Sequence, residues 1–139
     1  MNKRVFFYNA DISYNVPNKG ILRNKIAQLA DNEGFMLSNL NIILCSDNHL
    51  LEINKKHLNH SYYTDVITFD LSENEKEIDG EIYVSLDRVR INKKIYNVSL
   101  LIELQRVILH GVLHLVGYDD HNEKDISIMR KKEQFYLGL

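Results

Sequence analysis

Cysteine, proline and glycine are scarce in this chain, and each scarcity excludes a class of protein. Cys45 is the only cysteine, so no disulfide can form within the chain, as is usual in a reducing cytosol. One proline and six glycines among 139 residues argue against linker-like or low-complexity segments. We therefore expect a single folded domain over residues 1–139, with Cys45 in its core.

Long hydrophobic runs are also missing. The longest apolar-rich stretch, SLLIELQRVILHGVLHLVG, is interrupted by Glu103, Gln105, Arg106 and two histidines, which argues against a membrane span. The first residues, MNKRVFFYNADISYN, contain an apolar run of only three residues, too short for the core of a signal peptide. These features predict a cytoplasmic protein with no membrane partner.

The chain has no excess of basic residues. Its net charge is −2 and its pI is near 6.3, which argues against tight nucleic-acid binding driven by the charge of the whole molecule. Basic residues do cluster at Lys55 and Lys56, between Arg88 and Lys94, and over residues 130–132. Each cluster is interpreted as a solvated helix face, with a local RNA-binding patch as the alternative.

The apolar pattern predicts strands and helices in mixed order. Strands are expected over residues 4–8, 37–45, 64–69 and 80–86. Helices are expected over residues 18–32, from a cap at Asp47 to about Leu58, over 99–116, and from a cap at Asn122 to about Tyr136. Together they predict an α+β fold with a single mixed sheet of about four strands and about four to five helices.

Two histidines on the predicted helix 99–116 carry the most informative pattern. His110 and His114 are four residues apart, which places them on one helix face, one turn from each other. Gly117 follows, and because glycine tolerates positive φ it can end the helix and return the chain with a third ligand. Three protein ligands leave a fourth position for water, as in catalytic zinc sites, so we predict one Zn²⁺ per chain. Buried histidines without any partner would be costly.

The spacing is similar to that of the H-E-x-x-H motif on the metal-binding helix of zincin metalloproteases. In this chain Gly111 stands where that motif has its general-base glutamate. A peptidase that uses this base is therefore not expected.

The segment HGVLHLVGYDDH, with TDVITF and GEIYVS upstream, resembles the YbeY family of metal-dependent endoribonucleases. Members typically show a TDVLSF-like strand, a GDI-like strand and HGxLHLxGYDH, and the match runs in the same order from about Leu51 to Met129. The resemblance implies a zinc site that includes His110 and His114, RNA as substrate, and a role in 16S ribosomal RNA maturation and ribosome quality control. It also implies ribosomal RNA, the small ribosomal subunit and an assembly GTPase as partners.

The third metal ligand is one point at which the chain departs from the family pattern. Five residues separate the second histidine from the family's third ligand, and this count from His114 leads to Asp120, with a histidine one step later at His121. The fixed length of the glycine turn favours Asp120, since carboxylate oxygen binds zinc at about 2.0–2.2 Å, much like imidazole nitrogen. His121 is the alternative, because imidazole is the commoner ligand and one inserted residue can bulge.

Leu58 marks a second departure, because the family has an RNA-binding arginine at this place, after an LNxxY segment. The corresponding residues here are INKKHL, residues 53–58. Lys55, Lys56, His57 or His60 are the candidates that would hold RNA instead.

Three further residues are candidates for the chemistry: Asp119, Asp65 and Arg106. Asp65 would orient a ligand histidine or support the substrate, or else make a local hydrogen bond at the start of a strand. Arg106, one turn before His110, would reach a phosphate, or else pair with Glu103. The general base is metal-bound hydroxide, a carboxylate such as Asp119, or the RNA 2′-hydroxyl acting through it.

The sequence thus predicts a zinc-dependent endoribonuclease that prefers single-stranded RNA. A metal-dependent hydrolase of a non-RNA substrate is one alternative. The other is a ribosome-assembly factor whose metal is structural and which does not catalyse. A free coordination position favours an enzyme, and a filled one favours the assembly factor.

Overall fold

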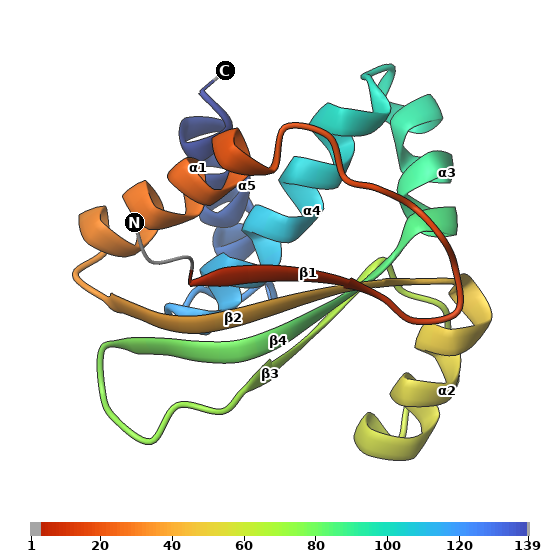
Figure 1. Ribbon diagram of the computed structural model, residues 1–139, viewed down its shortest axis with the longest axis horizontal. Helices are drawn as coiled ribbons and strands as arrows, with labels where there is room; N and C mark the ends of the chain where they lie inside the picture. The colour runs from red at the N-terminus through yellow and green to blue at the C-terminus, as the bar shows by residue number, and fades with distance from the viewer. Residues whose placement is uncertain (1–3, 139) are drawn as a thin grey trace.

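One mixed sheet organises the part of the chain that the structure, a computed structural model, describes, which is residues 4–138 (Figure 1). Its strands, in spatial order, are β1 (Val5–Asn9), β2 (Met36–Cys45), β4 (Glu77–Ser85) and β3 (Val66–Asp70). The first three run parallel, and β3 pairs with β4 in the antiparallel direction. The predicted α+β class with a single mixed sheet is confirmed, and β3 is left as an edge strand.

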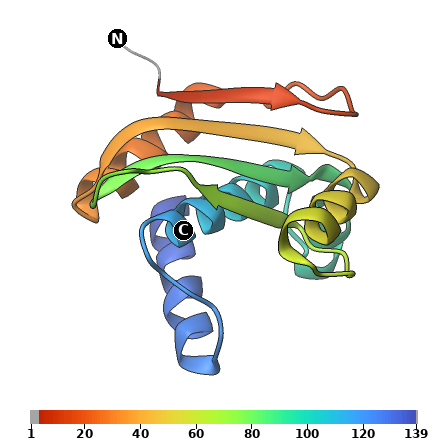
Figure 2. The ribbon, with the colours of Figure 1, turned by 90° about the horizontal axis from the view of Figure 1, so that it is seen from below.

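Helices cover both faces of the sheet unequally. They are α1 (Lys19–Asn32), α2 (Asp47–Leu58), α3 (Leu86–Tyr96), α4 (Leu100–Leu115) and α5 (Glu123–Leu137). Helices α1, α4 and α5 pack on one face, where the larger apolar core lies (Figure 1). Helix α2 lies near the ends of β2 and β4 (Figure 2), over a smaller core of Cys45, Leu50 and Ile67. The expected burial of Cys45 is confirmed, and that burial raises the pKa of its thiol to about 12.

Helix α4 is the central helix and presents the histidine pair to β3. The Oγ of Ser99 accepts a hydrogen bond from the backbone N–H of Ile102 at 3.1 Å, which caps its first turn. Gly111 lets α4 approach the sheet closely, since a Cβ there would lie 3.0 Å from Ile82 and 3.1 Å from Thr68. Gly111, which stands where the H-E-x-x-H motif has its glutamate, therefore has a packing role.

No single helix within residues 4–138 combines the length and apolar character needed to cross a membrane. Helices α3 and α4 reach that threshold only as a pair bent by 114°.

Several boundaries differ from those expected. Strand β4 begins at residue 77, because residues 77–79 also pair with β2, and it ends at Ser85, directly before helix α3. The apolar pattern did not predict this helix, since only Leu86 and Val89 are buried and it has little apolar periodicity. The basic cluster between Arg88 and Lys94, interpreted as a solvated helix face, lies on it. The Oγ of Ser85 caps it by accepting from the N–H of Arg88 at 3.1 Å.

The caps of the other predicted helices gave mixed results. Ser46, and not Asp47, caps α2, since its Oγ accepts from the N–H of His49 at 3.1 Å. The predicted cap at Asn122 is confirmed, because its Oδ1 accepts from the N–H of Asp125 at 2.8 Å. Strand β3 begins at Val66, two residues later than expected.

Candidate metal centre

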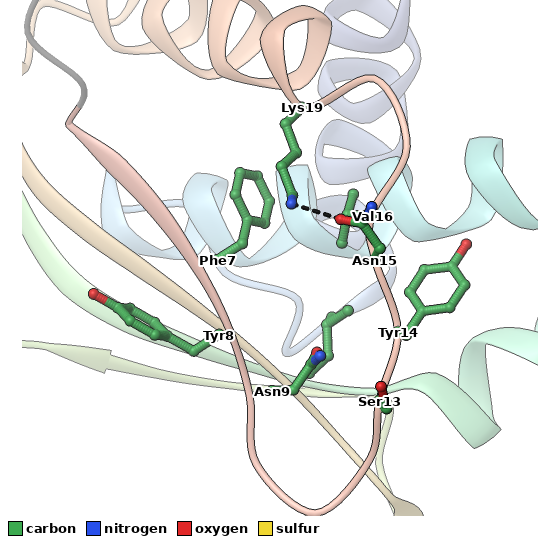
Figure 3. Close-up of a pocket in the computed structure, with 9 residues that line it drawn as sticks. Phe7, Tyr8, Asn9, Ser13, Tyr14, Asn15, Val16 and Lys19 are labelled. Atoms are coloured by element: carbon green, nitrogen blue, oxygen red, sulfur yellow. Dashed lines mark hydrogen bonds between the residues drawn. The ribbon is translucent and has the colours of Figure 1, made fainter.

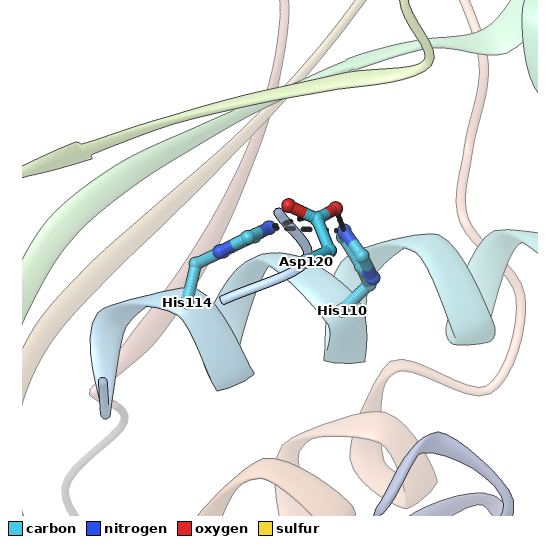
Figure 4. A group of neighbouring side chains, drawn as sticks. All are labelled: His110, His114 and Asp120. Carbon is cyan, nitrogen blue, oxygen red and sulfur yellow. Dashed lines mark hydrogen bonds and ion pairs between the residues drawn. The ribbon is translucent and has the colours of Figure 1, made fainter. Parts of the chain in front are cut away.

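The side chains of His110, His114 and Asp120 converge (Figure 4). The two histidine Nε2 atoms are 3.0 Å apart, and Asp120 Oδ2 lies 3.4 Å from that of His110 and 3.6 Å from that of His114. Donor atoms at about 2.0–2.1 Å from a tetrahedral ion are separated by about 3.3–3.4 Å. The three atoms therefore form a triangle, here called the donor triangle, of the size that one tetrahedral ion requires.

A turn after α4 brings Asp120 to the histidines. Helix α4 ends at Leu115, and Gly117 has φ of +102°, a conformation that L side chains rarely adopt. The N–H of Tyr118 donates to the carbonyl of Leu113 at 3.0 Å, which closes the turn. The predicted role of Gly117 in ending the helix and returning the chain is confirmed.

Asp120 and His121, the two candidates for the third ligand, have different surroundings. The Asp120 side chain is 41% exposed and completes the donor triangle. The His121 side chain is 80% exposed and points its Nε2 toward Asp119 Oδ1, 3.8 Å away. The structure thus brings Asp120, and not His121, to the histidine pair.

Glu133, on α5, binds the ring nitrogen of His110 that lies outside the donor triangle. Its Oε2 accepts a hydrogen bond from His110 Nδ1 at 2.6 Å, and its side chain is almost fully buried. Burial alone would raise the pKa of Glu133, but the bond to His110 and the charge of Arg106 lower it, so the carboxylate is ionised. An acceptor at Nδ1 fixes the proton there and leaves Nε2 free to bind a cation.

The sequence assigned this orienting role to Asp65 as one of its alternatives, and the structure gives the position to Glu133. Asp65 Oδ2 instead accepts from the side-chain amide of Asn92 at 3.1 Å and lies 3.7 Å from Arg106 Nη2. Glu133 was missed because nothing in the sequence links a glutamate on the last helix to a histidine 23 positions earlier.

His114 is held in the form that binds metal. Burial, and then the neighbouring His110, lower the pKa of His114. Its imidazole is therefore neutral near neutral pH, and neutral imidazole is the species that coordinates metal ions.

Arg106 faces carboxylates within the protein. Its guanidinium bonds Glu103 at 2.6 and 2.9 Å and Glu133 at 3.0 Å. Burial opposes its charged form, but the bonds and charges of these two glutamates outweigh burial and raise the pKa of Arg106. Of the two roles that the sequence allowed, the structure shows the ion pair with Glu103, and Arg106 does not line the pocket above the donor triangle.

A pocket of about 390 Å³ opens over the donor triangle, and we call it the metal pocket. Its walls come from the end of α2, the loop that follows it, β3, and the turn after α4. Its lining residues are Asn54, Leu58, His60, Tyr62, Thr64, Asp65, Val66, Ile67, Thr68, His110, His114, Asp120 and His121. The donor triangle therefore has an accessible side.

Of the four candidate RNA-binding residues, only His60 lines the metal pocket. Lys55 lies 3.9 Å from Glu52 on the surface of α2, and Lys56 is exposed beside it. His57 contacts Phe69 edge to face, with ring centroids 5.9 Å apart, and lines a different pocket. Leu58, at the place of the family arginine, lines the metal pocket and adds an apolar wall.

Another pocket, of about 170 Å³, lies at the opposite edge of the sheet, beside β1 (Figure 3). Phe7, Tyr14 and Lys19 are among its lining residues, none of which is a histidine, cysteine or carboxylate. It therefore lacks the side chains that most often bind zinc, which are histidine, cysteine and carboxylates.

Comparisons with known proteins point to one family. Residues 9–138 match the family model described as Endoribonuclease YbeY. A protein of that name from Cytophaga hutchinsonii is 41% identical over 135 residues, which cover 97% of this chain and 94% of the relative. Another from Amoebophilus asiaticus is 43% identical over 133 residues, covering 96% and 90%. A solution structure of a Thermotoga maritima protein matches with a TM-score of 0.64 at 29% identity, covering 96% of this chain and 86% of the other. From these matches along nearly its whole length, the chain belongs to the YbeY endoribonuclease family.

Proposed function

We propose that this chain is a metal-dependent endoribonuclease that cleaves unpaired RNA and carries one Zn²⁺, held by His110, His114 and Asp120. The observation that carries the proposal is the donor triangle, whose accessible side faces the metal pocket. When bound, the ion would polarise a phosphoryl oxygen and lower the pKa of a bound water to about 7. The names of the relatives, Endoribonuclease YbeY, support the choice of RNA as substrate.

The protein's own residues prepare this site. Glu133 keeps a proton on His110 Nδ1, and the low pKa of His114 keeps its ring unprotonated. Asp120 contributes a carboxylate to the two imidazoles. Asp119 lies beside Asp120 with its carboxylate exposed, which makes it the side chain that we propose as general base.

The proposed substrate is unpaired RNA because a protein of net charge −2 lacks the basic surface that holds a duplex. A flexible strand can bend its phosphate toward the donor triangle, with Lys55 and Lys56 on the adjacent helix available to the backbone. The proposal includes cytoplasmic maturation of 16S ribosomal RNA and ribosome quality control, with the small subunit and an assembly GTPase as partners. Residues 1–139 would act as one catalytic domain.

Cleavage of labelled single-stranded and duplex RNA by the zinc-loaded protein tests the proposal. We expect slow cleavage of the single strand, little of the duplex, and loss of activity with a chelator. His114→Ala, which removes one corner of the donor triangle, is expected to be inactive. If this variant cleaves as fast as the parent protein, the activity belongs to a contaminant and the proposal is wrong.

A further inference from the structure

The loop between α2 and β3 places aromatic side chains at the rim of the metal pocket. His60 and Tyr62 line this pocket, and Tyr62 is 57% exposed. Large aromatic surfaces left in water beside a pocket are typical of binding sites. Nothing in the proposed chemistry uses these rings.

His60 and Tyr62 form a preassembled stack within this loop. Their ring centroids are 5.1 Å apart at an interplanar angle of 21°, and Tyr62 Oη lies 2.9 Å from His60 Nδ1. Both residues line the metal pocket. The stack therefore lies in the same pocket as the donor triangle.

Asn54, a buried residue of α2, anchors the stack. Its Nδ2 donates to the carbonyl of Tyr62 at 2.9 Å, and its own carbonyl accepts from the N–H of His60 at 3.0 Å. The side chain of Asn54 is almost fully removed from solvent, so these bonds fix the backbone that carries both aromatic side chains. A surface that is ordered before its ligand arrives loses little conformational entropy on binding.

We propose that His60 and Tyr62 form a stacking platform for an unpaired nucleobase next to the scissile phosphate. The inference rests on the proposed function, because it names how the RNA substrate is held. When a phosphate of a single-stranded RNA lies at the donor triangle, the neighbouring bases lie along the walls of the metal pocket. Aromatic faces stack every base without reading its edges, so the platform selects single strands and not a particular sequence.

A tryptophan at the platform tests the stacking directly, because the chain contains no tryptophan of its own. In zinc-loaded Tyr62→Trp protein, a short 2′-O-methyl oligouridine, which resists cleavage, is expected to quench the emission. An abasic oligomer with the same phosphates is expected not to quench it. Tyr8→Trp is the matched control, since Tyr8 is 51% exposed on β1 at the opposite edge of the sheet. Equal quenching by both oligomers, or no quenching by either, would overturn the platform.

Binding constants give a second test. Tyr62→Ala is expected to weaken binding of the oligouridine about tenfold, within the range measured for loss of one base stack, and to leave binding of the abasic oligomer unchanged. Tyr62→Phe keeps the ring and is expected to bind like the parent protein. Lys56→Ala removes a charge and is expected to weaken both oligomers alike. The platform is wrong if Tyr62→Ala binds oligouridine normally or if Tyr62→Phe loses as much as Tyr62→Ala.

These measurements are separate from cleavage. If oligouridine quenches the emission of Tyr62→Trp protein but the parent protein cleaves no RNA, the platform is supported and the proposed enzyme is contradicted. Cleavage of RNA by a protein in which Tyr62→Ala binds as well as the parent would support the enzyme and contradict the platform.

Discussion

At the scale of the residue, Asp120 and His121 are adjacent in sequence, but only one of them is placed to bind the metal ion. Both carry groups that bind zinc in proteins. Only Asp120 lies with His110 and His114, because the turn after Gly117 returns the chain by a fixed length. The assignment of Asp120 as third ligand stays a prediction, and paired variants test it.

Loss of a group that only orients a metal ligand weakens metal binding by roughly 10- to 100-fold. Because Asp120 is itself a proposed ligand, we expect Asp120→Ala to weaken zinc binding by more than this. His121→Ala is expected to change the affinity little, because the imidazole lies at the surface. Competitive titration with a zinc indicator measures both. The opposite result, in which only His121→Ala loses the metal, would mean that the chain rearranges to bring His121 inward.

Glu133 binds both His110 and Arg106, and its hydrogen bond with His110 is the one that orients a metal ligand. We expect Glu133→Gln to weaken zinc binding about tenfold, at the lower end of the range for groups that orient a ligand, because an amide oxygen accepts less strongly than a carboxylate. Glu123→Gln makes the same change at an exposed position of the same helix and serves as control. Equal zinc affinities for the two variants would show that Glu133 does not orient the ligand.

At the scale of the element, the unit that matters is α4 with the turn that follows it. Gly117 and Gly20 have no heavy atom within 4 Å of the place where a Cβ would be, so neither is required by crowding. They differ in backbone conformation, since Gly117 has φ of +102° and Gly20 lies in the first turn of α1. The pair therefore separates the effect of backbone conformation from that of packing.

Gly117→Ala is expected to lower the free energy of unfolding by about 1–2 kcal/mol, because an L residue strains this conformation. It is also expected to weaken zinc binding, since relief of the strain moves Asp120. Gly20→Ala is expected to be neutral or to stabilise by up to about 1 kcal/mol and to leave zinc binding unchanged. Urea denaturation and zinc titration measure these effects, and equal stability of the two variants would contradict the account of the turn.

At the scale of the whole molecule, Glu33 joins parts of the chain that are far apart in sequence. It caps the end of α1, and its carboxylate accepts hydrogen bonds from Tyr118 at 2.7 Å, from Lys132 at 3.1 Å, and from Tyr136. These bonds tie α1 both to the turn that carries Asp120 and to α5. Burial alone would raise the pKa of Glu33, but the bonds from the two tyrosines and the lysine lower it below its ordinary value of 4.5.

A lowered pKa in the folded state means that Glu33 stabilises the protein fully above about pH 4.5, and that this stabilisation is lost as the pH falls through the lower value. Glu33→Gln is therefore expected to cost about 1.5–3 kcal/mol at neutral pH, with a difference from the parent that shrinks in acid. Thermal unfolding across pH measures this. Glu52→Gln, at a side chain that is 71% exposed, is the control and is expected to follow the parent curve. A Glu33→Gln difference that stays constant with pH would contradict the assignment.

Sequence alone determined those features whose causes are local. The four-residue spacing of His110 and His114 placed two imidazoles on one helix face, and Gly117 predicted the turn that returns Asp120. All these residues lie within one helix and one turn, whose geometry depends on short-range sterics and hydrogen bonds. The cap at Asn122 and the strands of the sheet were predictable for the same reason.

Tertiary structure alone decided the features that join distant segments. These are the order of the strands, the hydrogen bond from His110 to Glu133, the ion pair of Arg106 with Glu133, and the position of the His60–Tyr62 stack in the metal pocket. The packing of helix α3 belongs with them, since its mostly polar sequence buries only Leu86 and Val89. Such contacts depend on how elements pack, and a local pattern of residue types contains no information about which distant side chain will fill a given position.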